Sequence, residues 1–182
     1  MRRAAPALAL LLLLAGCSST DATTETSSTS SSPSPTASSS PSPSKPAFNP
    51  CSGLSAGPVG KALREKVRET TGTSDNPRCA FLPVAKGGPT LNVTYLEFGG
   101  DFDKAFAAMG QIKGRVSDVR IPGATAARVV VHASRKVVLV TGFVQVHGLI
   151  ETVNAIQLAP YDAGTMRDAT EAVMRTLVAT AP

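Results

Sequence analysis

The stretch KVVLVTGFVQVH, residues 136–147, decides the fold class. Successive side chains of a β-strand point to opposite faces of its sheet, so alternate residues of this stretch form two sets. Both sets are apolar, which is typical of a central strand covered on both faces. We expect a central strand in a filled core; the alternative leaves one face apolar for a ligand or partner. The two sets are Val137, Leu139 and Phe143 on one face and Val138, Val140, Val144 and Val146 on the other.

Turn residues separate this stretch from two further strand-like runs. Ser134-Arg135 precedes it and Gly148 follows it. Ala127–His132 and Leu149–Leu158 are therefore predicted to be its neighbouring strands. An earlier pair of runs, joined by a Gly-Gly-Pro turn, predicts an antiparallel hairpin. The hairpin comprises Cys79–Val84, the turn Lys86-Gly87-Gly88-Pro89 and Thr90–Phe98.

Apolar residues at helical spacing predict three helices. Ser55 or Gly57 caps the first, Asp101 the second and Asp162 the third, and Gly72–Pro77 is expected to be a turn-rich connector. The order of elements predicts an α+β fold, with an antiparallel sheet of about five strands packed by about three helices in a single domain. The apolar stripes are Val59, Ala62, Leu63 and Val67; Phe102, Ala105, Phe106, Met109 and Ile112; and Met166, Ala169, Val173 and Leu177.

The N-terminus has the organisation of an export signal. Met1-Arg2-Arg3 is positively charged, and the apolar run Ala7–Ala15 is shorter than the roughly 20 residues that span a bilayer. Leu14-Ala15-Gly16-Cys17 then matches the lipobox of bacterial lipoproteins. We therefore predict that residues 1–16 are a signal peptide, recognised through Leu14, Ala15 and Gly16, and that Cys17 is lipidated. The alternative is an ordinary secretory signal with an incidental cysteine.

Lipidation at Cys17 implies a location on the outer face of the cell membrane. One acyl chain holds a protein reversibly, whereas two or three chains hold it almost permanently. The expected partner is therefore membrane lipid, bound through acylated Cys17, in an extracytoplasmic location. No other segment approaches the length or apolarity of a membrane span.

Residues 17–46 are predicted to be the lipidated cysteine and a disordered tether. Of the 29 residues at 18–46, 24 are Ser, Thr or Pro, so the segment has almost no apolar surface to offset the entropy of ordering. A flexible coil of this length has a root-mean-square span of about 30 Å. Residues 47–182 remain as one α+β extracytoplasmic domain, long enough to bury a substantial core.

Charge patterning excludes nucleic acid as a partner. The net charge of +5 includes Arg2 and Arg3, which leave with the signal peptide. The remaining cations are dispersed, with no run longer than Arg135-Lys136, and no aromatic residue interleaves with a basic cluster.

The remaining two cysteines are expected to form a disulfide. Cys51 and Cys79 are the pair left in an oxidising compartment once Cys17 carries lipid. A zinc site is the competing interpretation, but two thiols 28 residues apart with no nearby histidine do not provide its ligands. No metal and no cofactor are expected.

Short motifs in residues 47–182 resemble an actinobacterial lipoprotein family of unknown function, domain of unknown function 3558. They are Asn49-Pro50-Cys51 with Leu54 and Ser55, Cys79-Ala80-Phe81, and Ile121-Pro122-Gly123-Ala124-Thr125-Ala126. The plan of lipobox, Ser/Pro tether and two-cysteine domain is similar as well. The resemblance implies no catalytic residue, because the family has none assigned. A more distant similarity to extracellular sensor domains of actinobacterial kinases implies binding of a ligand or partner.

Signals for catalysis are present but weak in context. Gly53-Leu54-Ser55-Ala56-Gly57 matches the nucleophile-elbow pattern, yet the elbow requires a buried strand directly before the serine. His132 and His147 lack a third histidine for a metal site. Glu97, Asp101 and Asp103 resemble a weak cation site and are better explained as a solvated face, with Asp101 as a helix cap.

We therefore expect a non-enzymatic binding or interaction module of the cell envelope, whose partner is an envelope protein, a polymer or an apolar ligand. The alternative is a carrier or sensor of a lipid-like small molecule. A hydrolase that uses Ser55 is the third interpretation. An internal cavity lined by Leu139, Phe143, Phe106 and Met109 would favour the carrier, and a filled core with an exposed apolar patch would favour the module.

Overall fold

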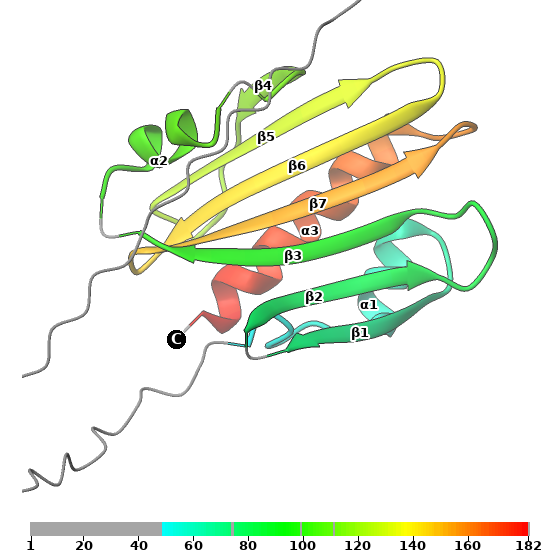
Figure 1. Ribbon diagram of the computed structural model, residues 1–182, viewed down its shortest axis with the longest axis horizontal. Coiled ribbons are helices and arrows are strands. Elements are labelled where there is room, and N and C mark those ends of the chain that lie inside the picture. Colours follow the sequence, from blue (N-terminus) through cyan, green and yellow to red (C-terminus); the bar gives the residue numbers. More distant parts are fainter. Residues whose placement is uncertain (1–48, 74, 99, 111, 182) are drawn as a thin grey trace, which may run out of the picture. The chain divides into compact units, whose positions relative to one another are not determined.

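The computed structural model describes residues 49–181 except residues 74, 99 and 111 (Figure 1). Three helices and seven strands form one α+β domain, as the fold class predicted. In chain order the elements are α1 (Ala56–Leu63), β1 (Val67–Thr73), β2 (Asn76–Pro83), β3 (Thr90–Glu97), α2 (Phe102–Ala108), β4 (Arg115–Asp118), β5 (Ala126–Ala133), β6 (Val137–Val146), β7 (Leu149–Leu158) and α3 (Ala163–Thr180).

All seven strands belong to one antiparallel sheet in the order β1-β2-β3-β7-β6-β5-β4. The three longest runs of pairing join β3 to β7, β7 to β6 and β6 to β5. The stretch at 136–147 therefore contains the strand that lies between β5 and β7. Its apolar character on both faces follows from this interior position.

Helices α1 and α3 cover one face of the sheet, behind the strands in Figure 1. Their apolar side chains pack against Val140 and Val144 of β6 and Val153 and Ala155 of β7. Gly142 lies among these residues because a Cβ atom there would come within 2.5 Å of the sulfur of Met174 in α3. We call this side of the sheet the inner face.

A second, smaller cluster lies on the other side of the sheet, which we call the outer face. Phe102 of α2 packs there with Phe143 of β6 and Ile150 of β7. The ring centroids of Phe106 and Phe143 are 5.2 Å apart in an edge-to-face arrangement. Beneath α2 the predicted filled core around β6 is thus present, whereas Val137 and Leu139 at the other end of the strand are half-exposed.

The sheet has seven strands, so the expectation of about five was too low. Both missed strands, β1 and β4, form its edges. Val67 belongs to β1 and not to the first helix, because Arg64 ends α1 in the left-handed conformation with φ 56°. The second helix is also shorter than its apolar stripe, and Met109 and Ile112 lie beyond its end.

Different segments of the chain lie at the two ends of the sheet along the strand direction. At one end, the hairpin end, lie the β2–β3 turn, the β5–β6 turn and the β7–α3 connection (Figure 1). At the opposite end, the entry end, the described chain begins and α3 ends (Figure 1). Cys51, near this beginning, is bonded to Cys79, the fourth of the eight residues of β2, with their Cα atoms 5.0 Å apart. Thr180 at the end of α3 donates a hydrogen bond to the Ser52 carbonyl there. The predicted disulfide is thus confirmed.

Candidate functional site

The outer face carries a row of polar side chains across three central strands. Asn92 of β3 pairs with Asn154 of β7, which pairs in turn with Thr141 of β6. The Thr141 hydroxyl donates a 3.0 Å hydrogen bond to Oδ1 of Asn154. Oδ1 of Asn92 is buried and has no hydrogen-bond partner among the described residues. A buried acceptor without a donor costs free energy.

Aliphatic side chains flank this polar row on the outer face. Ile156, two residues beyond Asn154, is 42% exposed, and its neighbours in register are Leu139 of β6 and Thr90 of β3. On the far side, Leu96 of β3 is 49% exposed. No helix of the described residues packs on the outer face of β1–β3. The result is an open surface with a polar centre and apolar borders, which suits a partner of mixed chemistry.

A second feature is the cleft around Arg128 of β5. The guanidinium donates hydrogen bonds to Asp118 of β4 at 2.8 Å and to Asp103 of α2 at 3.0 Å. It also lies 4.6 Å from the ring centroid of Phe106. The hydrogen bond to Asp118 raises the pKa of Arg128 above its ordinary value. These contacts hold β4 and α2 against β5. The role of Arg128 is therefore structural.

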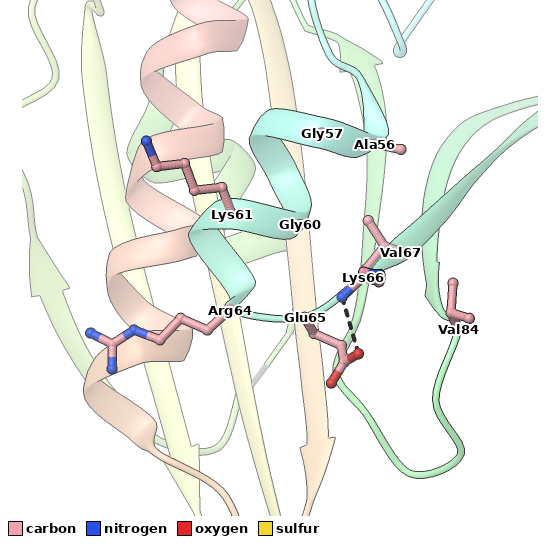
Figure 2. Close-up of a pocket in the computed structure, with 9 residues that line it drawn as sticks. All are labelled: Ala56, Gly57, Gly60, Lys61, Arg64, Glu65, Lys66, Val67 and Val84. Carbon is pink, nitrogen blue, oxygen red and sulfur yellow. Dashed lines mark hydrogen bonds between the residues drawn. The ribbon is translucent and has the colours of Figure 1, made fainter.

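A third feature is an open groove of about 760 Å³ at the C-terminal end of α1 (Figure 2). Lys61 and Arg64 extend to the same side of α1, whereas Val84 lies on the opposite side of Glu65. A Glu65 carboxylate oxygen accepts a hydrogen bond from the Lys66 backbone N–H at 3.0 Å. The groove is basic along one side and aliphatic along the other. It does not converge on a single anion-binding point.

Glu151 of β7 is the most unusual charged residue of the core. It is fully buried, and neither carboxyl oxygen has a hydrogen-bond partner in the described part of the chain. It lies on the inner face between Tyr95 of β3 and Val144 of β6. Burial raises the pKa of Glu151 to about 7, because a low-dielectric surrounding disfavours the charged form.

The structure does not form the catalytic constellation that the nucleophile-elbow pattern requires. Ser55 occupies the N-cap position of α1 and follows a turn, with no strand before it among the described residues. Its hydroxyl makes no capping hydrogen bond, so the expected side-chain cap is absent, whereas Asp101 and Asp162 do cap α2 and α3. His132 lies near the hairpin end and His147 at the entry end, so the two histidines are not brought together.

The other predicted site residues are the acidic group that contains Asp103 and the lipobox at the N-terminus. Asp103 is paired with Arg128, and the side chain of Glu97 lies outside the described part of the chain, as do Leu14, Ala15, Gly16 and Cys17. Among described residues, one group has metal-ligand spacing: Cys51, Glu69 and Cys79. Both its sulfurs are bonded to each other, which removes them as ligands. No described helix is long and apolar enough to cross a membrane.

A family model matches residues 12–137, and its description is "Protein of unknown function (DUF3558)". The chain belongs to this family. The match extends from the N-terminal apolar run to the first residue of β6, so it includes both disulfide cysteines and β1–β5. No curated protein and no solved structure matches the chain.

Sequence reasoning missed Asn92 and Glu151. Asn92 was visible only as part of an Asn-Val-Thr run in a predicted strand, and its burial depends on pairing with β7. Glu151 did give a signal in the sequence. Alternate residues of a strand face the same side of the sheet, so Glu151 is predicted to face the same side as the apolar Val153 and Ala155. A carboxyl group on the core-facing set of a strand marks a position that packing alone does not explain.

Proposed function

We propose that this member of the DUF3558 family is a membrane-anchored extracytoplasmic lipoprotein whose domain acts by binding and not by catalysis. The lipobox at residues 14–17 supports the anchor. The Cys51–Cys79 disulfide supports export, because such bonds persist in oxidising compartments outside the cytoplasm. The binding surface is the outer face around Asn92.

The observation that carries the binding role is the unpartnered, buried Oδ1 of Asn92 on an otherwise open surface. Native proteins rarely leave a buried acceptor unsatisfied, so binding that turns the Asn92 side chain outward and supplies a donor would recover the cost. The exposed aliphatic side chain of Ile156 borders this position. A partner that supplies an N–H or O–H donor beside apolar groups, such as a segment of another envelope protein, matches this chemistry.

The carrier and the hydrolase receive less support. Phe106 and Phe143, two of the residues expected to line a carrier cavity, are in ring contact and fill the space between α2 and the sheet. Ser55 lacks the preceding strand of a nucleophile elbow. A filled core with exposed Ile156 and Leu96 is the combination that favours an interaction module.

Site-specific photo-crosslinking in the producing cell tests the binding surface. A photoreactive residue at position 156 is expected to give one discrete crosslinked species, and the same residue at exposed Ala179 of α3 is expected to give none. Asn92→Ala should reduce the crosslink at least fivefold. The free energy of unfolding of the variant should lie within about 1 kcal/mol of the wild-type value, because the deleted acceptor makes no hydrogen bond with the described residues.

Two outcomes would remove the outer face as the binding surface. One is equal crosslinking from positions 156 and 179, and the other is an undiminished crosslink in Asn92→Ala. A small molecule released from the native domain in stoichiometric amount, with no crosslinked protein, would favour the carrier instead.

A further inference from the structure

The hairpin end of the domain gathers basic residues from three separate connections. Lys61, Arg64 and Lys66 come from the end of α1 and its link to β1, Lys86 from the β2–β3 turn, and Arg135 and Lys136 from the β5–β6 turn. All six are exposed, and none forms a salt bridge with another described residue. Two acidic residues share this end, Glu65 and Asp162. The end therefore keeps an excess of positive charge.

Both acidic residues have local structural roles. Glu65 accepts a hydrogen bond from the Lys66 backbone N–H. Asp162 caps α3 by accepting from the backbone N–H and the hydroxyl of Thr165, and the backbone hydrogen bond lowers the pKa of Asp162. Neither carboxylate neutralises a neighbouring cation through a direct salt bridge.

Exposed aliphatic residues lie directly beside these cations. Val84 is 64% exposed, and its backbone N–H donates a 2.8 Å hydrogen bond to the carbonyl of Lys66. Leu158 is 61% exposed, and the next residue, Ala159, donates a 2.9 Å hydrogen bond to the carbonyl of Lys136. A dissolved polyanion gains little from such side chains. A lipid surface accepts aliphatic side chains among its acyl chains while its headgroups take the cations.

We propose that the hairpin end docks on the surface of an anionic lipid bilayer. The inference rests on the proposed lipid anchor for one point, which is that the domain is already held beside a membrane. Docking there needs little intrinsic affinity, because attachment raises the local concentration of the domain at the lipid surface.

Vesicle sedimentation with the mature chain carrying Cys17→Ser tests the docking without any contribution from acylation. The probes are vesicles of phosphatidylcholine alone and of phosphatidylcholine with an equal amount of phosphatidylglycerol, at low and at high salt. We expect binding to the anionic vesicles, weakened by salt. Lys86→Glu/Arg135→Glu/Lys136→Glu should weaken it at least tenfold, since each cation near an anionic surface contributes about fivefold to affinity.

The matched control is Arg78→Glu/Lys104→Glu/Arg120→Glu, which makes the same change of net charge at exposed positions near the entry end. It should retain binding within about threefold. Val84→Ser/Leu158→Ser should weaken vesicle binding several-fold and leave retention by soluble polyphosphate unchanged. The proposal is overturned if the two charge variants lose binding equally, or if the chain binds polyphosphate but not anionic vesicles. Failure of the Cys17 anchor in cells would leave this assay unaffected.

Discussion

At the scale of single residues, Glu151 makes the stability of the domain depend on pH. Its pKa in the folded protein is about 7, above the ordinary value of 4.5 for this group. Between these two pH values the folded state binds a proton that the unfolded state has lost. The free energy of unfolding therefore falls as pH rises through this window, by up to roughly 3 kcal/mol, and is level above it.

Glu151→Gln should remove this dependence, because a neutral amide of similar shape takes the place of the carboxyl group. Urea unfolding at pH 5 and pH 8.5 is the measurement. We expect the free energy of unfolding of the variant to match that of the wild type within about 1 kcal/mol at pH 5 and to exceed it by about 2–3 kcal/mol at pH 8.5. Glu69→Gln on exposed β1 is the matched control and should keep the wild-type slope. A Glu151→Gln protein that follows the wild-type slope would assign the effect to another group.

At the scale of elements, sequence periodicity located the long, strongly patterned strands well and failed for the edges. Leu149–Leu158 was predicted with both of its observed ends, because alternation and turn residues define it. β1 has the sequence VRETTGT and is mostly exposed, since no strand of the described residues pairs with its outer edge. An edge strand needs few apolar residues, so the signal that identifies central strands is missing from it. β4, with four residues, is too short for periodicity to be detected.

The contact between α3 and β6 depends on a glycine in the middle of the sheet. A Cβ atom at Gly142 would lie 2.5 Å from the Met174 sulfur and 2.8 Å from a methyl carbon of Thr170. A glycine inside a strand is unfavourable unless another element approaches closely, and here α3 does. In the sequence, Gly142 interrupts an apolar run. Why a glycine is needed there becomes clear only from the position of α3 in the fold.

Gly142→Ala should therefore destabilise the domain by about 1–3 kcal/mol, the usual cost of inserting a methyl group into a packed core. Denaturant unfolding measures the change. Gly57→Ala in α1 is the matched control, because nothing lies within 4 Å of the added Cβ. It should be neutral or stabilising by roughly 0.5–1 kcal/mol, since alanine favours helix. Equal stability of the two variants would mean that α3 moves away from β6 at no cost.

At the scale of the whole molecule, the candidate binding surface could not be predicted from the sequence. The disulfide followed from cysteine number and compartment, and the charges of the hairpin end are dispersed over residues 61–136. The topology brings these charges together, because the β2–β3 and β5–β6 turns lie at the same end of one sheet. The unpartnered Asn92 acceptor likewise arises from pairing between β3 and β7. Sites that depend on long-range pairing leave no local pattern in a single sequence.

The anchor is also a property of the whole chain, since two or three acyl chains on Cys17 would determine where the domain works. Each buried methylene contributes about 0.8 kcal/mol, so a multiply acylated cysteine holds a protein of any fold at the membrane. In the producing cell, we expect the mature protein to enter the detergent phase on detergent phase separation, with a mass that begins at an acylated Cys17.

Cys17→Ser should carry no lipid mass. Its chains that are cleaved elsewhere should move to the aqueous phase, whereas uncleaved chains keep the apolar run Ala7–Ala15 and stay with the detergent. Cys51→Ser/Cys79→Ser, which removes the disulfide and keeps Cys17, is the control that separates lipidation from folding: its molecules should still carry the lipid mass. Detergent-phase partitioning of cleaved Cys17→Ser chains at the wild-type level, or a mature wild-type N-terminus other than Cys17, would contradict the anchor. In that case the ordinary secretory signal would be the correct interpretation of residues 1–16, and the domain would act free of the membrane.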